Sequence, residues 1–219
     1  MEREERYLQR ISNVEASATR VLVTLLFTDL VGSTRRAVEL GDRAWSRLLE
    51  THHAQVRELF DTFGGHEIDC AGDGFFATFD TASDAVLCGD AITESVRSLG
   101  LQVRAGVHTG ECERLRGRVR GIAVHTAARL VRLAGPGEVL VTTTVRDVVS
   151  GSGIRFEDRG DHDLDGVPGS WRLFVVATGD ERDAAETLVG GLERSTHQVR
   201  WRTGPRTAAY SGRRDGSNG

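Results

Sequence analysis

The sequence contains no lysine, and all 28 of its basic residues are arginine. A Walker-type phosphate-binding loop needs a lysine, and so does any mechanism that forms a Schiff base on the enzyme, so both are excluded. Cysteine is also scarce. Cys70, Cys88 and Cys112 are an odd number and lack the paired spacing of a disulfide framework or a zinc site. This cysteine content fits a reducing, cytoplasmic setting.

Long apolar runs and an excess of basic charge are lacking as well. The apolar segment near the N-terminus is too short to span a bilayer, and residues 1–20 are too charged for a signal peptide, so we expect no membrane segment. The formal net charge of −4 gives no indication of a nucleic-acid partner.

What remains is the composition of a soluble globular chain, 39% hydrophobic and 27% charged over 219 residues, which predicts a single folded domain. We place this domain at residues 21–177, after a polar lead-in at 1–20. Residues 178–219 are predicted to be a disordered basic tail, because the part beyond Glu193 has six arginines, one aspartate and few apolar residues.

The most informative stretch is 25–34, which reads Leu-Leu-Phe-Thr-Asp-Leu-Val-Gly-Ser-Thr. An apolar run that ends in aspartate and leads into Gly-Ser-Thr is typical of a buried central strand followed by a helix. Asp29 would then lie at the end of the strand, where a metal ion can bind. The alternative is that Asp29 only caps the following helix.

A second carboxylate lies in the stretch 71–76, which reads Ala-Gly-Asp-Gly-Phe-Phe. Gly-Asp-Gly between short apolar segments predicts a hairpin tip, which presents Asp73 as the second carboxylate. The alternative is that Asp73 only shapes the turn.

The order of predicted elements is that of an α+β fold. Helical periodicity predicts a helix from Ser33 or Thr34 to about Leu40, and then a second helix with a buried stripe from Trp45 to Phe63, on which His52 is interpreted as a core histidine. Two short strands at 67–79, a helix capped by Thr81 or Ser83 that runs to about Leu99, and a strand at 101–107 complete a ferredoxin-like βαββαβ core.

A further helix is predicted at 123–134, and additional strands follow at 138–142, 154–157 and 171–175, the last after a turn at 166–169. In the ferredoxin-like core the first and third strands are central neighbours. We therefore expect Asp29 and Asp73 to lie close together and to share metal ions.

Taken together, these motifs resemble the catalytic domain of the class III adenylyl and guanylyl cyclases. The resemblance begins with Phe-Thr-Asp-Leu-Val-Gly-Ser-Thr and with Gly-Asp-Gly-Phe, whose aspartates are 44 positions apart. Further family-like pieces follow in order: Val-Arg-Ala-Gly-Val-His-Thr-Gly-Glu at 103–111, Gly-Ile-Ala-Val-His-Thr-Ala-Ala-Arg-Leu at 121–130, and Gly-Pro-Gly-Glu-Val at 135–139. The resemblance covers residues 21–176.

The resemblance implies a two-metal reaction on a purine nucleoside triphosphate. Two Mg²⁺ or Mn²⁺ ions would activate the 3′-hydroxyl, neutralise the pyrophosphate leaving group and hold both in line with the α-phosphate. Asp29 and Asp73 would be the metal ligands, together with the backbone carbonyl of Leu30, because Mg²⁺ takes one or two carboxylates plus substrate phosphates. Amides of Val31, Gly32, Ser33 and Thr34, at a helix N-terminus, would bind the phosphates.

In the family, an arginine on a later helix stabilises charge on the α-phosphate, and Arg129 matches it. His125, four residues earlier and on the same helical face, stands where the family usually has asparagine. The family places this helix in the second subunit of a head-to-tail dimer, so the resemblance implies a homodimer with two shared sites. The alternative is that Arg129 only pairs with a surface carboxylate.

Four positions depart from the family pattern: Asp69 replaces the purine-pocket lysine, Arg118 replaces its partner aspartate, His125 replaces asparagine, and Asp165 replaces a lysine near the end of the domain. Asp165 would repel a triphosphate. Asp69 and Arg118 reverse the polarity of an adenine pocket and predict a preference for guanine, which offers donors at N1 and the 2-amino group and an acceptor at O6. The alternative is that Asp69 and Arg118 form a salt bridge that closes the pocket.

Two hypotheses therefore stand. One is an active purine nucleotide cyclase of cyclic-nucleotide signalling. The other is a catalytically degenerate cyclase-like module for dimerisation or nucleotide sensing.

Overall fold

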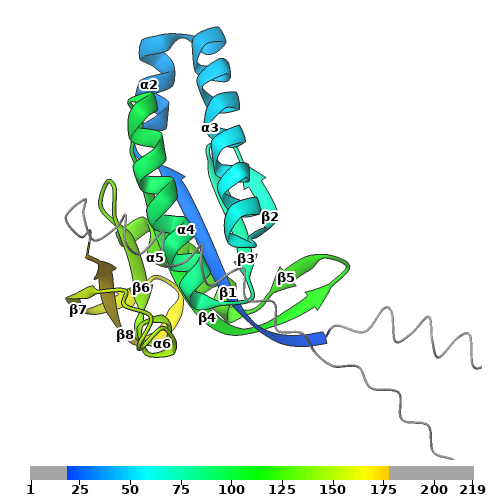
Figure 1. Cartoon of the computed structure of the whole chain (residues 1–219), viewed down its shortest axis with the longest axis vertical. Helices are drawn as coiled ribbons and strands as arrows, with labels where there is room; N and C mark the ends of the chain where they lie inside the picture. The colour runs from blue at the N-terminus through cyan, green and yellow to red at the C-terminus, as the bar shows by residue number, and fades with distance from the viewer. Residues whose placement is uncertain (1–18, 178–219) are drawn as a thin grey trace, which may run out of the picture. The chain divides into compact units, whose positions relative to one another are not determined.

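The computed structural model describes residues 19–177 (Figure 1). The predicted tail and nearly all of the predicted lead-in lie outside the described residues. The elements are, in chain order, β1 (Thr19–Leu30), α2 (Ser33–Leu40), α3 (Asp42–Phe63), β2 (His66–Ala71), β3 (Gly74–Phe79), α4 (Ala82–Ser95), η1 (Val96–Leu99), β4 (Val103–Leu115), β5 (Arg118–Arg120), α5 (Ile122–Leu133), β6 (Val139–Thr142), α6 (Thr143–Val148), β7 (Phe156–Leu164) and β8 (Val167–Val176).

The strands form one sheet in the order β2-β3-β1-β4-β6-β8-β7, and β5 pairs with β4 beside this path. β1 is antiparallel to both β3 and β4, while β4 and β6 are parallel. The segment β2-β3-β1-β4 has the strand order of a ferredoxin-like core, and β6, β8 and β7 extend it. The predicted α+β fold with additional C-terminal strands is confirmed, including the pairing of the first and third strands.

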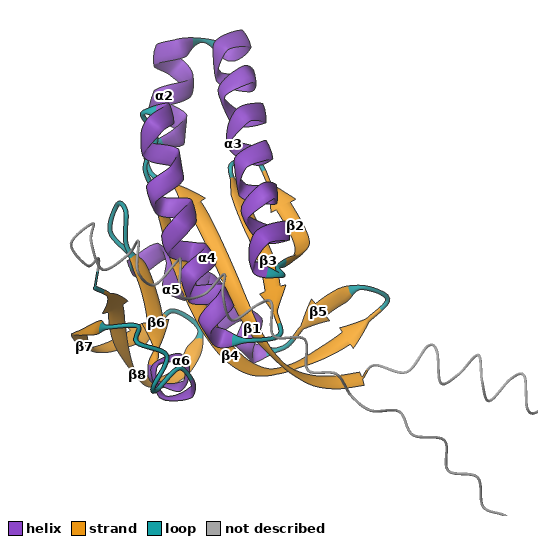
Figure 2. Cartoon of the chain, in the orientation of Figure 1, coloured by secondary structure: helices purple, strands orange, loops and turns teal. Residues whose placement is uncertain are grey.

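Helices cover both faces of the sheet (Figure 2). Leu26 and Leu30 of β1 belong to a core cluster shared with α3 and α4, whereas Val23 and Leu25 belong to a cluster shared with α5. Because successive side chains of a strand point to opposite faces, a strand covered on both sides must be apolar without interruption. This explains the continuous apolar run that precedes Asp29.

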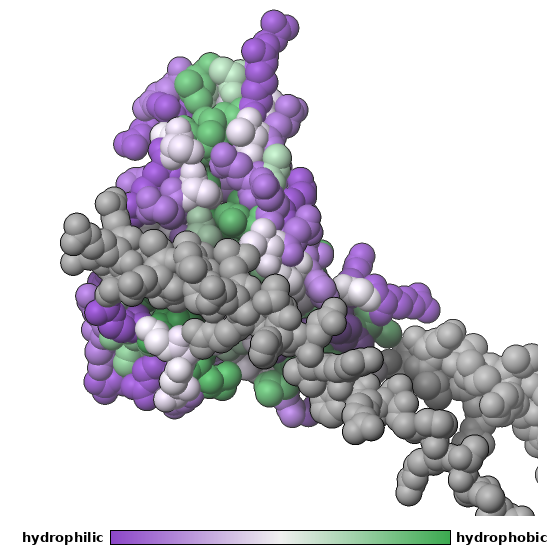
Figure 3. All heavy atoms as spheres, in the orientation of Figure 1, coloured by the Kyte–Doolittle hydropathy of each residue, from purple (hydrophilic) through white to green (hydrophobic). Residues whose placement is uncertain are grey.

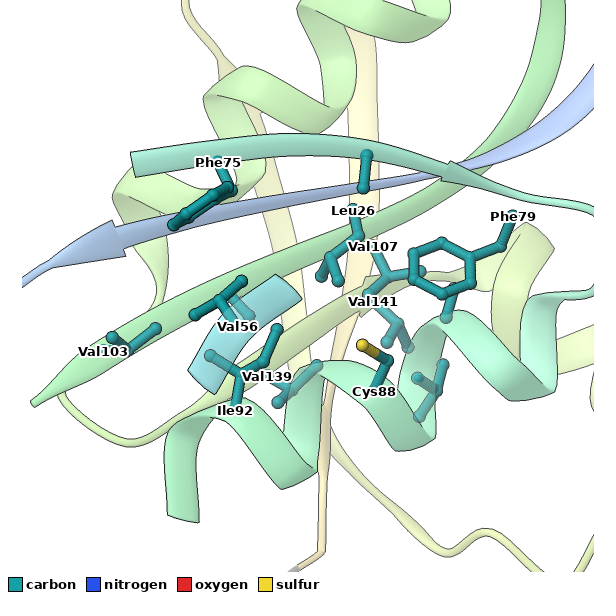
Figure 4. Packing of buried hydrophobic residues seen from close by; sticks show 14 of the residues in the cluster. Leu26, Val56, Phe75, Phe79, Cys88, Ile92, Val103, Val107, Val139 and Val141 are labelled. Atoms are coloured by element: carbon teal, nitrogen blue, oxygen red, sulfur yellow. The ribbon is translucent and has the colours of Figure 1, made fainter. Parts of the chain in front are cut away.

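The larger core cluster lies between the sheet and α3 and α4 (Figure 4). The side chains labelled there are at most 2% exposed: Leu26, Val56, Phe75, Phe79, Cys88, Ile92, Val103, Val107, Val139 and Val141. Burial raises the pKa of the Cys88 thiol to about 12, so it stays protonated and behaves as a small apolar side chain. All three cysteines are free, as expected.

α2 and α3 form an antiparallel helical pair joined at Gly41, whose φ of 74° is a conformation that glycine adopts without strain. This confirms the predicted break after Leu40. On α3, His52, Val56 and Phe60 are buried at spacings of four, so His52 is a core histidine, as interpreted. Hydrophobic residues reach the surface in the upper part of Figure 3. Val38 of α2 is 81% exposed.

The C-terminal strands differ from expectation. β7 runs from Phe156 to Leu164 and β8 already begins at Val167, so the turn consists of Asp165 and Gly166 instead of residues 166–169. Pro168 is tolerated in β8 because β8 pairs with β6 only from Leu173 onward, so the missing N–H of Pro168 breaks no bond to that neighbour.

No helix in the described part of the chain is long and apolar enough to cross a membrane.

Candidate functional site

The C-terminal end of β1 lies beside the turn of the β2–β3 hairpin. Thr28 pairs with Phe75, and its Oγ1 accepts a hydrogen bond of 3.2 Å from the Phe75 amide. A Cβ on Gly74 would lie 2.8 Å from the Thr28 carbonyl oxygen, so the two backbones approach as closely as glycine allows. Asp29 directly follows Thr28, and Asp73 directly precedes Gly74. The structure thus brings these two aspartates together, as predicted.

This close approach yields a stability prediction. Gly74→Ala should lower the free energy of unfolding by about 1–3 kcal/mol, because the added methyl group meets a backbone oxygen that cannot rotate away. Urea denaturation measures the change. Gly89→Ala is the control, since its Cβ would meet only side chains, at 3.3 Å or more. Equal losses in the two variants would contradict the close contact at Gly74.

Asp29 is held by Arg104 from the adjacent strand β4. The Nε and Nη2 groups of Arg104 donate to the same oxygen, Oδ2, at 2.9 and 2.5 Å. Arg104 also donates through Nη1 to the backbone carbonyl of Arg132 near the end of α5, at 3.2 Å. Asp29 is 35% exposed, and its Oδ1 has no hydrogen bond among the described residues, so Oδ1 is open to a cation. The sequence did not single out Arg104, since only the register of β1 and β4 places it opposite Asp29.

Asp73 lies in a two-residue turn whose first residue, Gly72, has a positive φ of 65°, as a type II′ turn requires. Its Oδ2 is buried and has no hydrogen-bond partner. A buried carboxylate oxygen without a donor is costly unless it faces a cation, so this atom fits a metal ligand. Within residues 19–177 no cluster of three or more His, Cys, Asp or Glu side chains is arranged as a complete metal site. Two carboxylates with an open side are nonetheless the donor set that Mg²⁺ takes together with substrate phosphates.

Two histidines of α3 lie beside the turn that carries Asp73. His53 Nε2 lies 3.0 Å from the Gly72 carbonyl oxygen. The pKa of His52 is lowered to about 4, chiefly by burial and then by His53, against the opposing influence of Asp73. His52 is therefore neutral at pH 7 and adds no positive charge that would compete with a metal at Asp73. The stripe of α3 indicated that His52 is buried, but not that it lies beside Asp73.

The N-terminus of α2 follows Asp29 directly. Its N-cap is Gly32, in the left-handed conformation, and no side chain caps the helix. The Val31 amide donates to the Gln102 carbonyl at 2.8 Å and is thus already used, whereas in the described part of the chain the amides of Gly32, Ser33 and Thr34 have no acceptor. The buried side chain of Leu30 is a hydrocarbon, so only the backbone carbonyl of Leu30 can be a metal ligand.

On α5, His125 is exposed and Arg129 is partly buried. Arg129 Nε donates to the backbone carbonyl of Asp165 at 2.9 Å and lies 3.9 Å from the Asp165 carboxylate. Asp165, which was expected to repel a triphosphate, thus lies in contact with Arg129. The alternative for Arg129 was a pair with a surface carboxylate, and this contact with Asp165 is such a pair.

Asp69 and Arg118 are both exposed, on β2 and β5. Asp69 pairs across the hairpin with Phe76, so it shares the face of the sheet on which Phe76 stacks against Phe27, with ring centroids 4.3 Å apart. Its Oδ1 accepts a hydrogen bond from the Cys70 amide. Among the described residues no ion pair joins Asp69 to Arg118, so the salt bridge proposed as the alternative does not form in the single chain.

The candidate residues fall into two groups. The first group lies where β1 and the β2–β3 hairpin end, and consists of Asp29, Asp73 and the start of α2. The second group consists of His125 and Arg129 on α5, Asp69 on β2 and Arg118 on β5. In the part of the chain that the structure describes, no hydrogen bond or ion pair joins a member of the first group to a member of the second.

Comparison with curated proteins finds cyclases among the relatives. A putative adenylate cyclase 3 of Rhizobium meliloti is 28% identical over 161 residues, which cover 69% of this chain and 27% of the relative. A receptor-type adenylate cyclase of Trypanosoma equiperdum is 30% identical over 172 residues, which cover 55% of this chain and 36% of the relative. The chain spans between about a fifth and a half of the length of the curated relatives it matches.

Solved structures show the same fold. The adenylyl cyclase CyaB from P. aeruginosa superposes with a TM-score of 0.69 at 22% identity, over 75% of this chain and 98% of that one. The guanylate cyclase domain of RhGC from Catenaria anguillulae, in complex with GTP, gives a TM-score of 0.67 at 16% identity, over 74% of this chain and all of that one. The family model described as adenylate and guanylate cyclase catalytic domain matches residues 16–178. The match spans the whole described fold, including both aspartates and Arg129, and the chain therefore belongs to the adenylate and guanylate cyclase catalytic domain family.

Proposed function

We propose that this nucleotidyl cyclase domain converts a purine nucleoside triphosphate into its 3′,5′-cyclic monophosphate and pyrophosphate, at sites shared by two chains of a head-to-tail homodimer, for cyclic-nucleotide signalling. The observation that carries the proposal is the meeting of Asp29 and Asp73, where a buried Asp73 oxygen lacks a partner and Asp29 Oδ1 is open. These atoms lie beside a helix N-terminus that no side chain caps.

Asp29, Asp73 and the Leu30 carbonyl would hold two Mg²⁺ or Mn²⁺ ions. Such ions lower the pKa of the attacking hydroxyl and neutralise charge on the leaving pyrophosphate. The amides of Gly32, Ser33 and Thr34 would bind phosphate oxygens, because a helix N-terminus presents unpaired N–H groups and a positive dipole end. The Val31 amide does not take part, since it already donates to Gln102.

Arg129 suits stabilisation of the α-phosphate in the transition state. Its Nε is anchored to the Asp165 carbonyl, which fixes the plane of the guanidinium and leaves the two Nη groups for a bidentate contact. His125, one helical turn earlier and exposed, lies on the same face and can contact the ribose.

The exposed face of α5 supports association with a second copy. Ile122 and Leu133, at the two ends of the helix, are 57% and 44% exposed, and His125 and Arg129 lie between them on the same face. Exposed apolar side chains around polar functional groups are typical of a surface that a partner covers. A partner chain at this face would bring its own Asp29 and Asp73 to Arg129.

A cyclic-nucleotide assay of the purified protein with ATP and GTP, each with Mg²⁺ and Mn²⁺, tests the proposed function. Metal-dependent release of cyclic nucleotide and pyrophosphate is expected. The second candidate, a cyclase-like module without turnover, draws support from the contact between Asp165 and Arg129. Metal-dependent binding of a triphosphate without product would establish that candidate instead.

The base preference is expected to favour GTP. Ionised Asp69 only accepts hydrogen bonds and Arg118 only donates, which matches guanine and mismatches adenine. The ratio of kcat/KM for GTP to that for ATP should be about ten or more, since each unpaired polar group in a covered pocket costs about 1–3 kcal/mol. Asp69→Lys combined with Arg118→Asp should reverse the preference.

The control for this exchange is Arg114→Asp, which changes the charge of another exposed arginine on the hairpin of β4 and β5. It should leave the ratio unchanged. A wild-type protein that prefers ATP would show that Asp69 and Arg118 do not read the base.

A further inference from the structure

Arg129 lies close to the carboxylate of Asp165. Among the described residues, no other candidate catalytic side chain on α5 is paired with a carboxylate. Asp165 begins the two-residue turn between β7 and β8. Its backbone carbonyl accepts from Arg129 Nε at 2.9 Å, and its carboxylate lies 3.9 Å from the same nitrogen. One residue thus contacts Arg129 both through the main chain and through its charge.

The two contacts have different consequences for a phosphate. The carbonyl contact orients the guanidinium and leaves its Nη groups available. The carboxylate, 92% exposed beside an arginine that is 30% exposed, places a negative charge where a phosphate must approach Arg129. A phosphate oxygen and the carboxylate need the same cation, and the two anions repel each other.

We propose that the Asp165 carboxylate is an internal competitor of the substrate phosphate for Arg129, and so sets the triphosphate concentration at which this domain becomes occupied. This inference rests on the proposed function, because it concerns the same Arg129. Asp165 acts through Arg129 and is a positioning residue.

Asp165→Asn removes the charge and preserves the rest. The carbonyl that anchors Arg129 belongs to the main chain, and Asp165 does not have a positive φ, so asparagine fits the turn without strain. Asp163→Asn is the matched control, because Asp163 is an exposed aspartate two residues earlier on β7. It changes the net charge equally but lies away from the turn.

The experiment measures dissociation constants of 3′-deoxy-GTP and 3′-deoxy-ATP with Mn²⁺ by calorimetry, on the full chain. These analogues lack the attacking hydroxyl, so binding is separated from turnover. Asp165→Asn is expected to lower the dissociation constant about three- to tenfold, in line with a weak exposed pair. Asp163→Asn should change it less than twofold, and the gain should shrink between about 0.05 M and about 0.5 M salt.

A double-mutant cycle separates competition for Arg129 from simple repulsion. In an Arg129→Ala background, Asp165→Asn should no longer tighten binding. A gain that persists there, or equal affinities for wild type and Asp165→Asn, would overturn the inference while the proposed function stands. Absence of binding in every variant, Asp165→Lys included, would overturn both.

Discussion

Replacing Asp29 or Asp73 with asparagine is expected to lower metal-dependent turnover at least about a thousandfold, which corresponds to about 4 kcal/mol of transition-state stabilisation. Asparagine keeps the size of the side chain and an acceptor oxygen but removes the charge that holds a divalent ion. In Asp29→Asn that oxygen can still accept from Arg104, so the fold should be retained, with a loss in unfolding free energy of about 1 kcal/mol.

The measurement is the initial rate of cyclic-nucleotide formation, together with the thermal midpoint of each variant. Asp80→Asn is the control, since Asp80 is an exposed aspartate just beyond the opposite end of β3. It should retain full activity. Turnover above about a tenth of the wild-type rate in either asparagine variant of the site would show that this carboxylate is not a metal ligand.

Mixing inactive Asp29→Ala and Arg129→Ala proteins is expected to restore about a quarter of the wild-type activity. In a head-to-tail dimer each site combines Asp29 of one chain with Arg129 of the other. A mixed dimer therefore collects both lesions in one site and leaves the other intact. After free exchange of subunits about half of the dimers are mixed, and each of these has one working site of two.

Subunit exchange is verified with two different affinity tags. The whole mixture should show about a quarter of the wild-type rate, and the fraction that carries both tags should show about half. The control mixture joins Asp29→Ala with Asp73→Ala. Both of these lesions lie in the same half-site, so every dimer has two defective sites and no activity should return. Failure of the first mixture to regain activity, with exchange demonstrated, would indicate that each site is complete within one chain.

Local patterns were sufficient for the elements that hold the site. The strand that ends at Asp29, the turn that carries Asp73, the break between α2 and α3 and the buried position of His52 all follow from apolar periodicity and glycine placement, and all are present. The strand order also followed, because few arrangements satisfy a βαββαβ sequence of elements.

The partners of the site residues depended on the tertiary structure. Arg104 and Asp29 are 75 positions apart, and Arg129 and Asp165 are 36 apart, so only strand register and helix placement bring them together. The same holds for the Val31 amide, which the Gln102 carbonyl engages across the sheet. In this protein the sequence determined which carboxylates form the candidate site, because turn and strand signals are local, and the resemblance to the family added Arg129. Only the fold decided which hydrogen bonds those groups already make, because pairing between distant strands is a property of the whole chain.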